Sequence, residues 1–295
     1  MRENLLPSNR SYLLVVADDF GVSSPINRAV AEAHDKGVLT AASLTASGGT
    51  FEEAVRIAAE RTHLSVGLHV TLCDGRSVLP SSRIPALVDS YGRFEKSPAR
   101  AWLKYAKPEM LSQIEMEIEA QFERLESAGI HPTHVDSHHH LHMKPAIFEI
   151  TCRVAARRGV RWIRIAGESL RQVVSTPSLA RGAMPFLEWM VFGTLAPSNR
   201  NTAKGYGMRA ADRTFGLART GRIDEKYLLG IMNLMIHPVN EIFTHPDLSA
   251  ESGRRELKAL ASTRVKERIE GLGVALTGYR ELAEGMAFSS AWGRV

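Results

Sequence analysis

Side chains that could bind a metal or transfer protons are concentrated at four places in this 295-residue sequence. They are Asp18-Asp19, His69, the segment 136–142 (DSHHHLH) and His245. Each comes at or near the end of a short apolar segment, and the carboxyl ends of parallel strands meet at one edge of a sheet. We therefore expect carboxylates and imidazoles to converge there. Two histidines and a carboxylate are typical of a catalytic metal site that keeps positions open for water and substrate.

Each of these pieces also has a purely structural explanation. Asp18-Asp19 can form a polar turn, and His69, between two apolar residues, can be a hydrogen-bonded core histidine. Four histidines within 138–142 are not needed for packing and suit metal binding. His237 also precedes a proline, but it lies in a helix-to-strand loop at the opposite, amino edge of the sheet, so we exclude it.

The alternation of side chains along a strand divides these residues between roles. If the strand over 133–140 stays regular, residues 134, 136, 138 and 140 share one face and His139 points the other way. Asp18 and Asp19 are adjacent and must also point in different directions. One of them can therefore bind a metal while the other acts as an acid or base.

Apolar runs and helical periodicity alternate along the chain, and this order predicts the fold. The expected strands cover residues 12–17, 38–45, 64–72, 133–137, 160–165, 241–244 and 273–276. Ser24 is the expected N-cap of the first helix, Thr50 with Glu53 forms a predicted capping box, and a single helix is expected over 249–271. Six or seven strands, each followed by a helix, favour a (β/α) barrel, incomplete or distorted, over a doubly wound open sheet. We expect one α/β domain over 1–295 with irregular insertions over about 74–108 and 170–223.

Composition excludes several classes of protein. Hydrophobic residues make up 44% and charged residues 23%, as in ordinary globular domains. The two cysteines, Cys73 and Cys152, are too few for a disulfide framework or a cysteine zinc site. A net charge of +5 requires no nucleic-acid partner, and we expect none. The sequence shows no export signal and no apolar run of about 18 residues, so we expect a cytoplasmic location.

At these residues the chain resembles the YdjC-like carbohydrate deacetylases, a family that includes chitooligosaccharide deacetylases and proteins associated with hopanoid biosynthesis. The similarity runs along most of the chain. It rests on ADDFG at 17–21, S-x-x-N at 24–27, GVLTAASL at 37–44, GLHVTL at 67–72, THVDSHHHLH at 133–142 and E-x-x-x-H-P at 241–246. The family fold is an α/β barrel, in agreement with the order of the predicted elements.

The resemblance implies a role for six residues. It makes Asp19, His69 and His138 the ligands of one divalent metal ion. It makes Asp18 the base and His245 the general acid, and Arg164 resembles an arginine that pairs with the active-site carboxylate or holds the substrate. Zinc suits two imidazoles and one carboxylate best, with magnesium, cobalt and nickel as alternatives. A homodimer is suggested by the resemblance alone.

The implied reaction is hydrolysis of an N-acetyl group on an N-acetylglucosamine-type sugar. Three segments resemble the hopanoid-associated branch: GRSVLP at 75–80, RIPALVDSYGRF at 83–94 and ADRTFGLARTGRI at 211–223. DSHHHLHM at 136–143 resembles the oligosaccharide branch instead. We therefore expect a hopanoid glycolipid intermediate as substrate, with a chitooligosaccharide as the alternative.

Two hypotheses from other classes remain. The first is a non-haem iron oxygenase, whose ligand set of two histidines and one carboxylate is matched by His134, Asp136 and the distant His245. Such sites usually lie on all-β folds. A non-catalytic sugar- or lipid-binding protein is the second, but it would not need both Asp18-Asp19 and His245.

Residues 183–197 (AMPFLEWMVFGTLAP) would be apolar on every face of a helix. Such a helix is normally buried, in a core or in a dimer contact. The alternative is an apolar wall or interfacial patch beside the catalytic edge, with the basic residues that follow it meeting anionic headgroups. This alternative predicts peripheral contact with the inner face of a membrane. It also predicts that Trp189→Ala impairs turnover of a lipid-linked sugar more than that of a soluble one.

Overall fold

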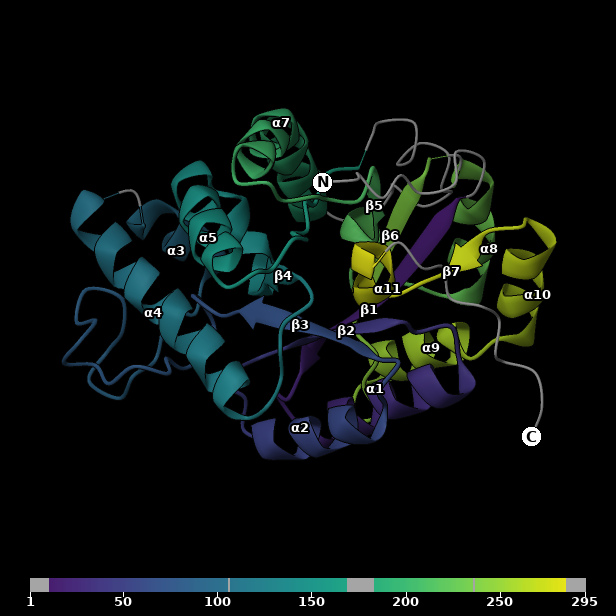
Figure 1. Cartoon of the computed structure of the whole chain (residues 1–295), viewed down its shortest axis with the longest axis horizontal. Coiled ribbons are helices and arrows are strands. Elements are labelled where there is room, and N and C mark those ends of the chain that lie inside the picture. The colour runs from purple at the N-terminus through teal and green to yellow at the C-terminus, as the bar shows by residue number, and fades with distance from the viewer. Residues whose placement is uncertain (1–10, 106, 169–182, 236, 285–295) are drawn as a thin grey trace.

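The computed structural model describes residues 11–105, 107–168, 183–235 and 237–284, without the side chains of residues 183–189. Within these ranges seven strands form one parallel sheet: β1 (Tyr12–Phe20), β2 (Ala41–Leu44), β3 (Ser65–Val70), β4 (Val135–Ser137), β5 (Arg213–Phe215), β6 (Val239–Thr244) and β7 (Ala275–Leu276). The helices are α1 (Ser24–Lys36), α2 (Phe51–Glu60), α3 (Pro98–Lys104), α4 (Pro108–Ser127), α5 (Pro145–Arg157), α7 (Ala183–Gly205), α8 (Glu225–Ile231), α9 (Glu251–Leu260), α10 (Thr263–Gly271) and α11 (Tyr279–Glu284). Short 3-10 turns are η1 (His138–Met143), η2 (Leu217–Arg219) and η3 (Met232–Leu234). Figure 1 shows the strands at the centre with helices around them.

The sheet curls into an incomplete barrel. Its strand order is β4-β3-β2-β1-β6-β5, and β7 pairs with the start of β1. The strand predicted over 160–165 is reduced to two bridging residues. Ile163 bridges Val135 in β4, and Trp162 bridges Arg209 ahead of β5, so this segment links the two outer edges of the sheet. The fold is the predicted (β/α) barrel in its incomplete form, and not a doubly wound open sheet.

The alternating side chains of β1 enter two different apolar clusters. Residues 13, 15 and 17 belong to the large core that lies between the sheet and the helices. Residues 12, 14 and 16 belong to a smaller cluster together with Trp162 and Tyr279. Because successive strand residues face opposite sides, this smaller cluster is the interior of the barrel at its amino end. The next inward position along β1 is Asp18.

The register between β1 and β6 places a second site residue at the same height. Leu14 pairs with Glu241 and Ala17 with Thr244, so the next inward positions of the two strands are Asp18 and His245. The sequence alternation therefore leads from an apolar layer at the amino end to an ionisable layer at the carboxyl end.

The predicted capping box at Thr50 and Glu53 is wrong. The side chain of Thr50 makes no capping hydrogen bond and donates instead to the Gly21 carbonyl oxygen at 3.0 Å. The Glu53 carboxylate accepts from Ser24 Oγ at 2.6 Å and from Asn27 Nδ2 at 2.9 Å. These side chains join the starts of α1 and α2 to the turn after β1, because that turn offers buried polar groups that need partners.

The single helix predicted over 249–271 is divided into α9 and α10. Ser262 lies between them and caps α10, accepting the Val265 N–H at 3.3 Å. A serine at this position offers the backbone an alternative to a continuous helix, so the amphipathic pattern continues across a break.

Residues 183–197 form the first part of α7, which continues through Pro197 to Gly205. The region predicted as an irregular insertion over 170–223 thus contains a long helix and β5 where it is described. Phe192 is buried, with its ring centre 5.9 Å from that of Trp102. The side chain of Trp189 lies outside the described residues, so dimer and membrane contact stay predictions.

No helix among the described residues combines the length and apolar character that a membrane span requires.

Candidate metal centre

The carboxyl end of β1 directs two adjacent carboxylates to different places. The pairing of β1 with β2 shifts register between Ala17 and Phe20, and Asp19 adopts a φ of 62°. This conformation is uncommon outside glycine and costs on the order of 1–3 kcal/mol. Asp18 points into the barrel toward Arg164, whereas Asp19 turns toward two histidines. The prediction that the two carboxylates point in different directions is confirmed.

Asn27 holds the turn that follows these carboxylates. Its Oδ1 accepts the Gly21 N–H at 2.8 Å, and its Nδ2 donates to the Thr50 carbonyl oxygen at 3.2 Å. Gly21 has a φ of 90°, and a Cβ there would lie 2.8 Å from the side chain of Leu44. The D-D-F-G and S-x-x-N motifs are therefore parts of one turn, and this turn sets the direction of Asp19.

Asp19, His69 and His138 bring one carboxylate oxygen and two imidazole nitrogens together. Asp19 Oδ1 lies 2.9 Å from His138 Nδ1 and 3.4 Å from His69 Nε2. All three candidate ligand atoms lie within 4.8 Å of one another. His69 comes from β3 and His138 follows β4, so the ends of three strands supply the donors. These are the residues that the family resemblance names as ligands.

The carboxylate of Asp136 orients His69. His69 Nδ1 donates a hydrogen bond to Asp136 Oδ1 at 2.7 Å, and both side chains are buried. With Nδ1 as the donor, a neutral His69 presents the lone pair of Nε2 to Asp19 and His138. Metal-binding histidines commonly have such a carboxylate partner, because it fixes the tautomer and the orientation of the ring.

The surroundings favour positive charge between these side chains. Burial lowers the pKa of His69, but Asp136 and Asp19 outweigh burial and raise that pKa to about 10. Burial raises the pKa of Asp19, yet the contacts with His138 and His69 lower it well below its usual value. Either a proton on His69 or a divalent cation supplies this charge, and metal binding displaces such protons.

The donor set fits a divalent cation. Asp19 Oδ1 is buried and forms no hydrogen bond of standard geometry, although two imidazole nitrogens approach it. A buried carboxylate oxygen is costly to leave without a partner, and a cation would satisfy it. Two imidazoles and one carboxylate also leave coordination positions open, as catalytic zinc sites do.

Two further groups of potential ligands occur among the described residues, and each is less suitable. Asp74 with His138 and His139 is largely exposed to solvent. Asp18 with His69 and Asp136 is buried, but the two carboxylates already bind Arg164. The cluster of Asp19, His69 and His138 is therefore the best cation site that the described residues offer.

The four histidines after β4 have different surroundings. The strand ends at Ser137, and His139 and His140 both have positive φ values, 52° and 51°. His138 faces Asp19, His139 is exposed, and His140 packs edge-on against Phe243 with ring centres 4.8 Å apart. The strand ends at Ser137 as predicted, and the condition of a regular strand through His140 is not met, because the chain turns at His139 and His140.

His142 has a structural role, because both of its ring nitrogens contact other protein atoms. Its Nδ1 lies 2.6 Å from Ser137 Oγ, and its Nε2 lies 2.8 Å from the Arg164 carbonyl oxygen. Burial lowers the pKa of His142 to about 4, which keeps the ring neutral at pH 7. This histidine fastens the 3-10 turn to the segment that carries Arg164.

Arg164 lies at the centre of a buried charge cluster that we define as Arg164, Asp18, Asp136 and Glu241. Arg164 Nη1 lies 2.7 Å from both Asp18 Oδ2 and Asp136 Oδ2, and its Nε donates to Glu241 Oε1 at 2.5 Å. Burial alone would lower the pKa of Arg164, but the three carboxylates raise it well above the usual value. The side chain is fully buried, so the structure shows the pairing role. Its substrate-binding role stays a prediction.

Asp18 and His245 are close without a direct hydrogen bond. Asp18 Oδ2 lies 3.9 Å from His245 Nε2, and Asp18 Oδ1 and His245 Nδ1 are buried atoms without hydrogen-bond partners. The backbone N–H of His245 donates to Glu256 Oε2 at 2.6 Å, which anchors the end of β6 to α9. Protein contacts thus hold both residues in place, and Asp18 Oδ1 and His245 Nδ1 can still form hydrogen bonds.

The residues of the iron-oxygenase hypothesis are not assembled into a ligand set. His134 Nε2 lies 3.1 Å from Ser43 Oγ, and its ring stacks on Tyr279 with centres 4.0 Å apart. A Cβ on Gly67 would lie 2.5 Å from this ring, so a glycine is needed beside it. No group of potential ligands among the described residues includes His134 or His245. His134 is a core histidine, with its pKa lowered to about 3 by burial.

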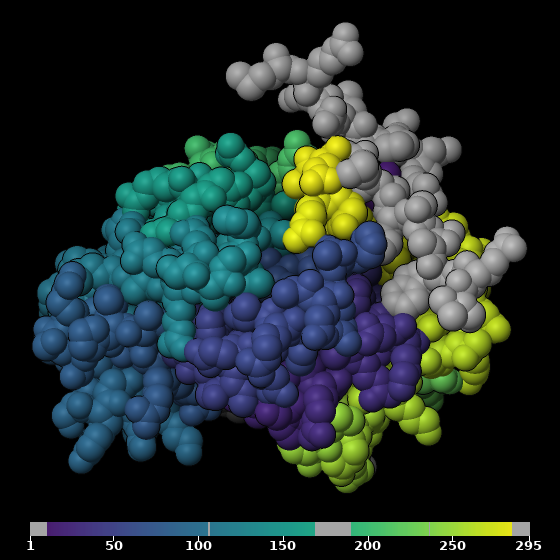
Figure 2. Space-filling view, turned by 60° about the horizontal axis from the view of Figure 1, so that its bottom comes forward, coloured from purple at the N-terminus to yellow at the C-terminus, as the bar shows by residue number. Residues whose placement is uncertain are grey.

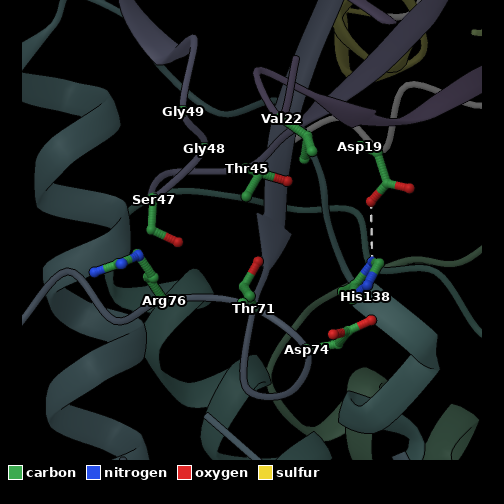
Figure 3. A pocket seen from close by; sticks show the side chains of 11 residues that line it. Asp19, Val22, Thr45, Ser47, Gly48, Gly49, Thr71, Asp74, Arg76 and His138 are labelled. Carbon is green, nitrogen blue, oxygen red and sulfur yellow. Dashed lines mark ion pairs between the residues drawn. The ribbon is translucent and has the colours of Figure 1, made fainter. Parts of the chain in front are cut away.

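A cleft of about 360 Å³ opens beside the metal cluster. Its lining includes Asp19, His138, Val22, Thr71 and Arg76. Figure 3 shows Asp19 and His138 on one side of this cleft and Arg76 on the other, with Thr71 between them. Asp18 and His245 are not part of its lining.

Sequence reasoning assigned no supporting role to three residues that hold the site together. Ser43 Oγ donates to Asp136 Oδ2 at 2.7 Å, Asp136 orients His69, and Glu241 binds Arg164. Their inward positions on β2, β4 and β6 are readable from strand alternation. The sequence gives no sign of which charged partner each of them meets.

Comparison with known proteins finds matches along most of the chain. The model of the family described as YdjC-like protein matches residues 12–271. A carbohydrate deacetylase from Brevibacillus brevis is 32% identical over 283 residues, which cover 92% of this chain and 99% of the relative. A chitooligosaccharide deacetylase from Salmonella typhimurium is 35% identical over 178 residues, covering 59% of this chain and 67% of the relative.

Solved structures show the same fold. A protein structure from Enterococcus faecalis V583 has a TM-score of 0.73 at 24% identity, covering 93% of this chain and 99% of the other. The family match spans the whole sheet except β7 and includes every strand end that supplies a donor. This chain is a member of the YdjC-like protein family.

Proposed function

We propose that this protein is a metal-dependent hydrolase that removes the acetyl group from an N-acetylglucosamine-type sugar. The observation that carries the proposal is the donor set of Asp19, His69 and His138 beside an open cleft. The relatives named as carbohydrate and chitooligosaccharide deacetylases support this chemistry. A sugar- or lipid-binding protein without activity would not need such a donor set next to Asp18 and His245.

Asp19, His69 and His138 would hold one divalent cation. Zinc suits these ligands best, with magnesium, cobalt and nickel as alternatives. The bound cation supplies Lewis acidity, which polarises the amide carbonyl and makes water easier to deprotonate. Asp136 keeps Nε2 of His69 directed at the site, because it holds the other ring nitrogen by a hydrogen bond.

Asp18 is the proposed base. Arg164 fixes its Oδ2, while its Oδ1 has no hydrogen-bond partner and can accept the proton of the attacking water. The bond from the water oxygen to the acetyl carbon then forms. The buried charge cluster keeps Asp18 in place throughout, because Arg164 is itself held by Asp136 and Glu241.

His245 is the proposed general acid. An amide C–N bond breaks readily only when the nitrogen leaves as an amine, so a proton must reach that nitrogen. His245 lies 3.9 Å from Asp18 and is partly exposed, which suits transfer between the barrel interior and the substrate. The products are acetate and the free amino sugar.

For the physiological acceptor we propose a hopanoid glycolipid intermediate, with a chitooligosaccharide as the second candidate. The support for the glycolipid is the resemblance of segments 75–80, 83–94 and 211–223 to the hopanoid-associated branch. The support for the oligosaccharide is the relative from Salmonella typhimurium that carries this name.

An acetate-release assay tests the proposal. Metal-loaded protein should release acetate and a free amine in equal amounts from N-acetylglucosaminyl substrates. A chelator should abolish the release, and addition of single metals should restore it. Running the assay on a lipid-linked N-acetylglucosamine and on soluble chitooligosaccharides compares the two acceptors. Metal-loaded protein that releases no acetate from either class would contradict the proposed function.

A further inference from the structure

A second hollow lies on the far side of Arg76 from the metal cluster. It measures about 440 Å³, and Arg76 is part of the lining of both hollows. Its other walls come from the loop between β3 and α3, including Val78, Leu79, Ser90 and Tyr91. Figure 2 shows this loop in blue at one end of the molecule. We propose that the second hollow binds the sugar ring that is linked to the N-acetylated ring of a chitooligosaccharide, the second of the two proposed acceptors. This inference rests on the proposed deacetylase function.

The second hollow is built by specific contacts with α4. The buried carboxylate of Glu117 accepts the N–H groups of Val78 and Leu79 at 2.8 and 3.0 Å. Gln113 Oε1, also from α4, accepts the Ala86 N–H at 2.9 Å. A buried carboxylate is costly unless its hydrogen bonds are formed, so these contacts define the position of the wall.

The opposite wall is a turn that presents an aromatic ring. Asp89 Oδ1 accepts the N–H groups of Tyr91 and Arg93 at 2.9 Å each, and Arg76 Nη1 donates to the Tyr91 carbonyl oxygen at 3.2 Å. Tyr91 is 73% exposed, the second most exposed large hydrophobic side chain described. The turn is thus ordered by side-chain contacts, while the ring itself covers no core.

These features match the chemistry of a sugar ring. A pyranose has an apolar C–H face, which stacks on an aromatic ring, and a rim of hydroxyl groups, which hydrogen-bond to polar side chains. Tyr91, Val78 and Leu79 supply apolar surface, and Ser90 and the Arg76 guanidinium supply hydrogen-bonding groups. Because Arg76 is common to both hollows, a substrate of two linked rings would pass over it.

The second hollow is tested by the ratio of kcat/KM for a two-ring substrate to kcat/KM for a one-ring substrate, measured by acetate release. Wild-type protein should hydrolyse the β-1,4-linked N-acetylglucosamine dimer with a higher kcat/KM than the monomer. Tyr91→Ala should lower this dimer-to-monomer ratio about tenfold, the scale of one lost aromatic contact. Tyr91→Phe keeps the aromatic ring and should retain the wild-type dimer-to-monomer ratio. Leu103→Ala is the matched control, because Leu103 is 74% exposed on α3 and lines neither hollow.

Binding measurements separate this inference from the proposed function. Calorimetry with the deacetylated glucosamine monomer and dimer requires no amide hydrolysis, and Tyr91→Ala should weaken dimer binding selectively. Unchanged dimer-to-monomer ratios in Tyr91→Ala, in both turnover and binding, would overturn the second hollow as a sugar site. Selective loss of dimer binding in a protein that releases no acetate would support the second hollow and contradict the deacetylase function. Circular dichroism confirms that each variant is folded.

Discussion

Two groups of ionisable side chains lie next to each other at the carboxyl edge of the sheet and differ in exposure and in hydrogen bonding. The metal cluster of Asp19, His69 and His138 borders a cleft, and the side chains of Asp19 and His138 are 20% and 23% exposed. The buried charge cluster around Arg164 has no more than 2% exposure at any member. In the charge cluster each carboxylate pairs with the Arg164 guanidinium, whereas in the metal cluster Asp19 meets two imidazoles.

The backbone differs in the same way. The described residues with positive φ other than glycine are Asp19, Asp74, His139 and His140. All four lie at or after the strand ends that carry the metal cluster: Asp19 near the end of β1, Asp74 after β3, and His139 and His140 in η1. Each such conformation costs on the order of 1–3 kcal/mol. Asp136 and Glu241 of the charge cluster lie on regular strands. Backbone strain is thus concentrated beside the cleft, whereas buried atoms without hydrogen-bond partners occur in both groups, including Asp18 Oδ1, Arg164 Nη2 and Glu241 Oε2 of the charge cluster.

The largest effect is expected from removal of a proposed metal ligand. His138→Ala should lose the metal and reduce acetate release about 10³-fold or more, since Lewis-acid catalysis contributes several kcal/mol. Metal analysis and the acetate assay measure both losses. His131→Ala, an exposed histidine in the loop before β4, is the matched control. Full metal occupancy in folded His138→Ala would remove this residue from the ligand set.

Removal of the proposed base should leave the metal in place. Asp18→Asn keeps the shape of the side chain and a hydrogen-bond acceptor for Arg164, but it cannot take a proton at neutral pH. Turnover should fall about 10²- to 10⁴-fold at unchanged metal content. Near-normal turnover would mean that another group accepts the proton and that Asp18 belongs only to the charge cluster.

Substitutions in the charge cluster should lower the free energy of unfolding, whereas substitutions in the metal cluster should lower activity. Arg164→Met leaves Asp18, Asp136 and Glu241 buried without their cation, and this should lower the free energy of unfolding by about 3–5 kcal/mol. Arg264→Met, at an exposed pair with Glu225, should change it by less than about 1 kcal/mol. Urea unfolding measures both variants. Equal effects would contradict the rigid role assigned to the charge cluster.

The smallest effect is expected from His142, which fastens the 3-10 turn after β4 to the segment that carries Arg164. An unfolded histidine titrates near pH 6.5, but burial lowers the pKa of His142 to about 4. The unfolded state therefore binds more protons between these values, and the free energy of unfolding falls as the pH drops from about 6.5 to about 4. His142→Gln should remove about 1–3 kcal/mol of this acid sensitivity, measured by urea unfolding at several pH values.

His131→Gln is the control for this pH series, because His131 is exposed to solvent in the loop before β4. Parallel stability curves for wild type and His142→Gln would show that folding does not lower the pKa of His142. The turn after β4 would then be held by other contacts.

The periodicity of the sequence, and the ionisable residues that follow its apolar segments, determined where the site lies. Apolar segments alternating with helices predict parallel strands, and parallel strands bring Asp18, His69 and His245 to one edge. The alternation along β1 also predicts that Asp18 and Asp19 diverge. These features are local, because the direction of a side chain on a strand follows from the backbone of that strand alone.

Only the tertiary structure decided which partners these side chains meet. Arg164 binds Asp18 across 146 positions of sequence, and Asp136 meets His69 across 67. The fate of the four histidines after β4 depends on two positive φ values that the surrounding contacts stabilise against their cost. Such pairings depend on how the sheet curls and closes through Trp162 and Ile163, and that closure involves strands far apart in the chain. Residue types and spacing alone do not reveal this closure of the sheet.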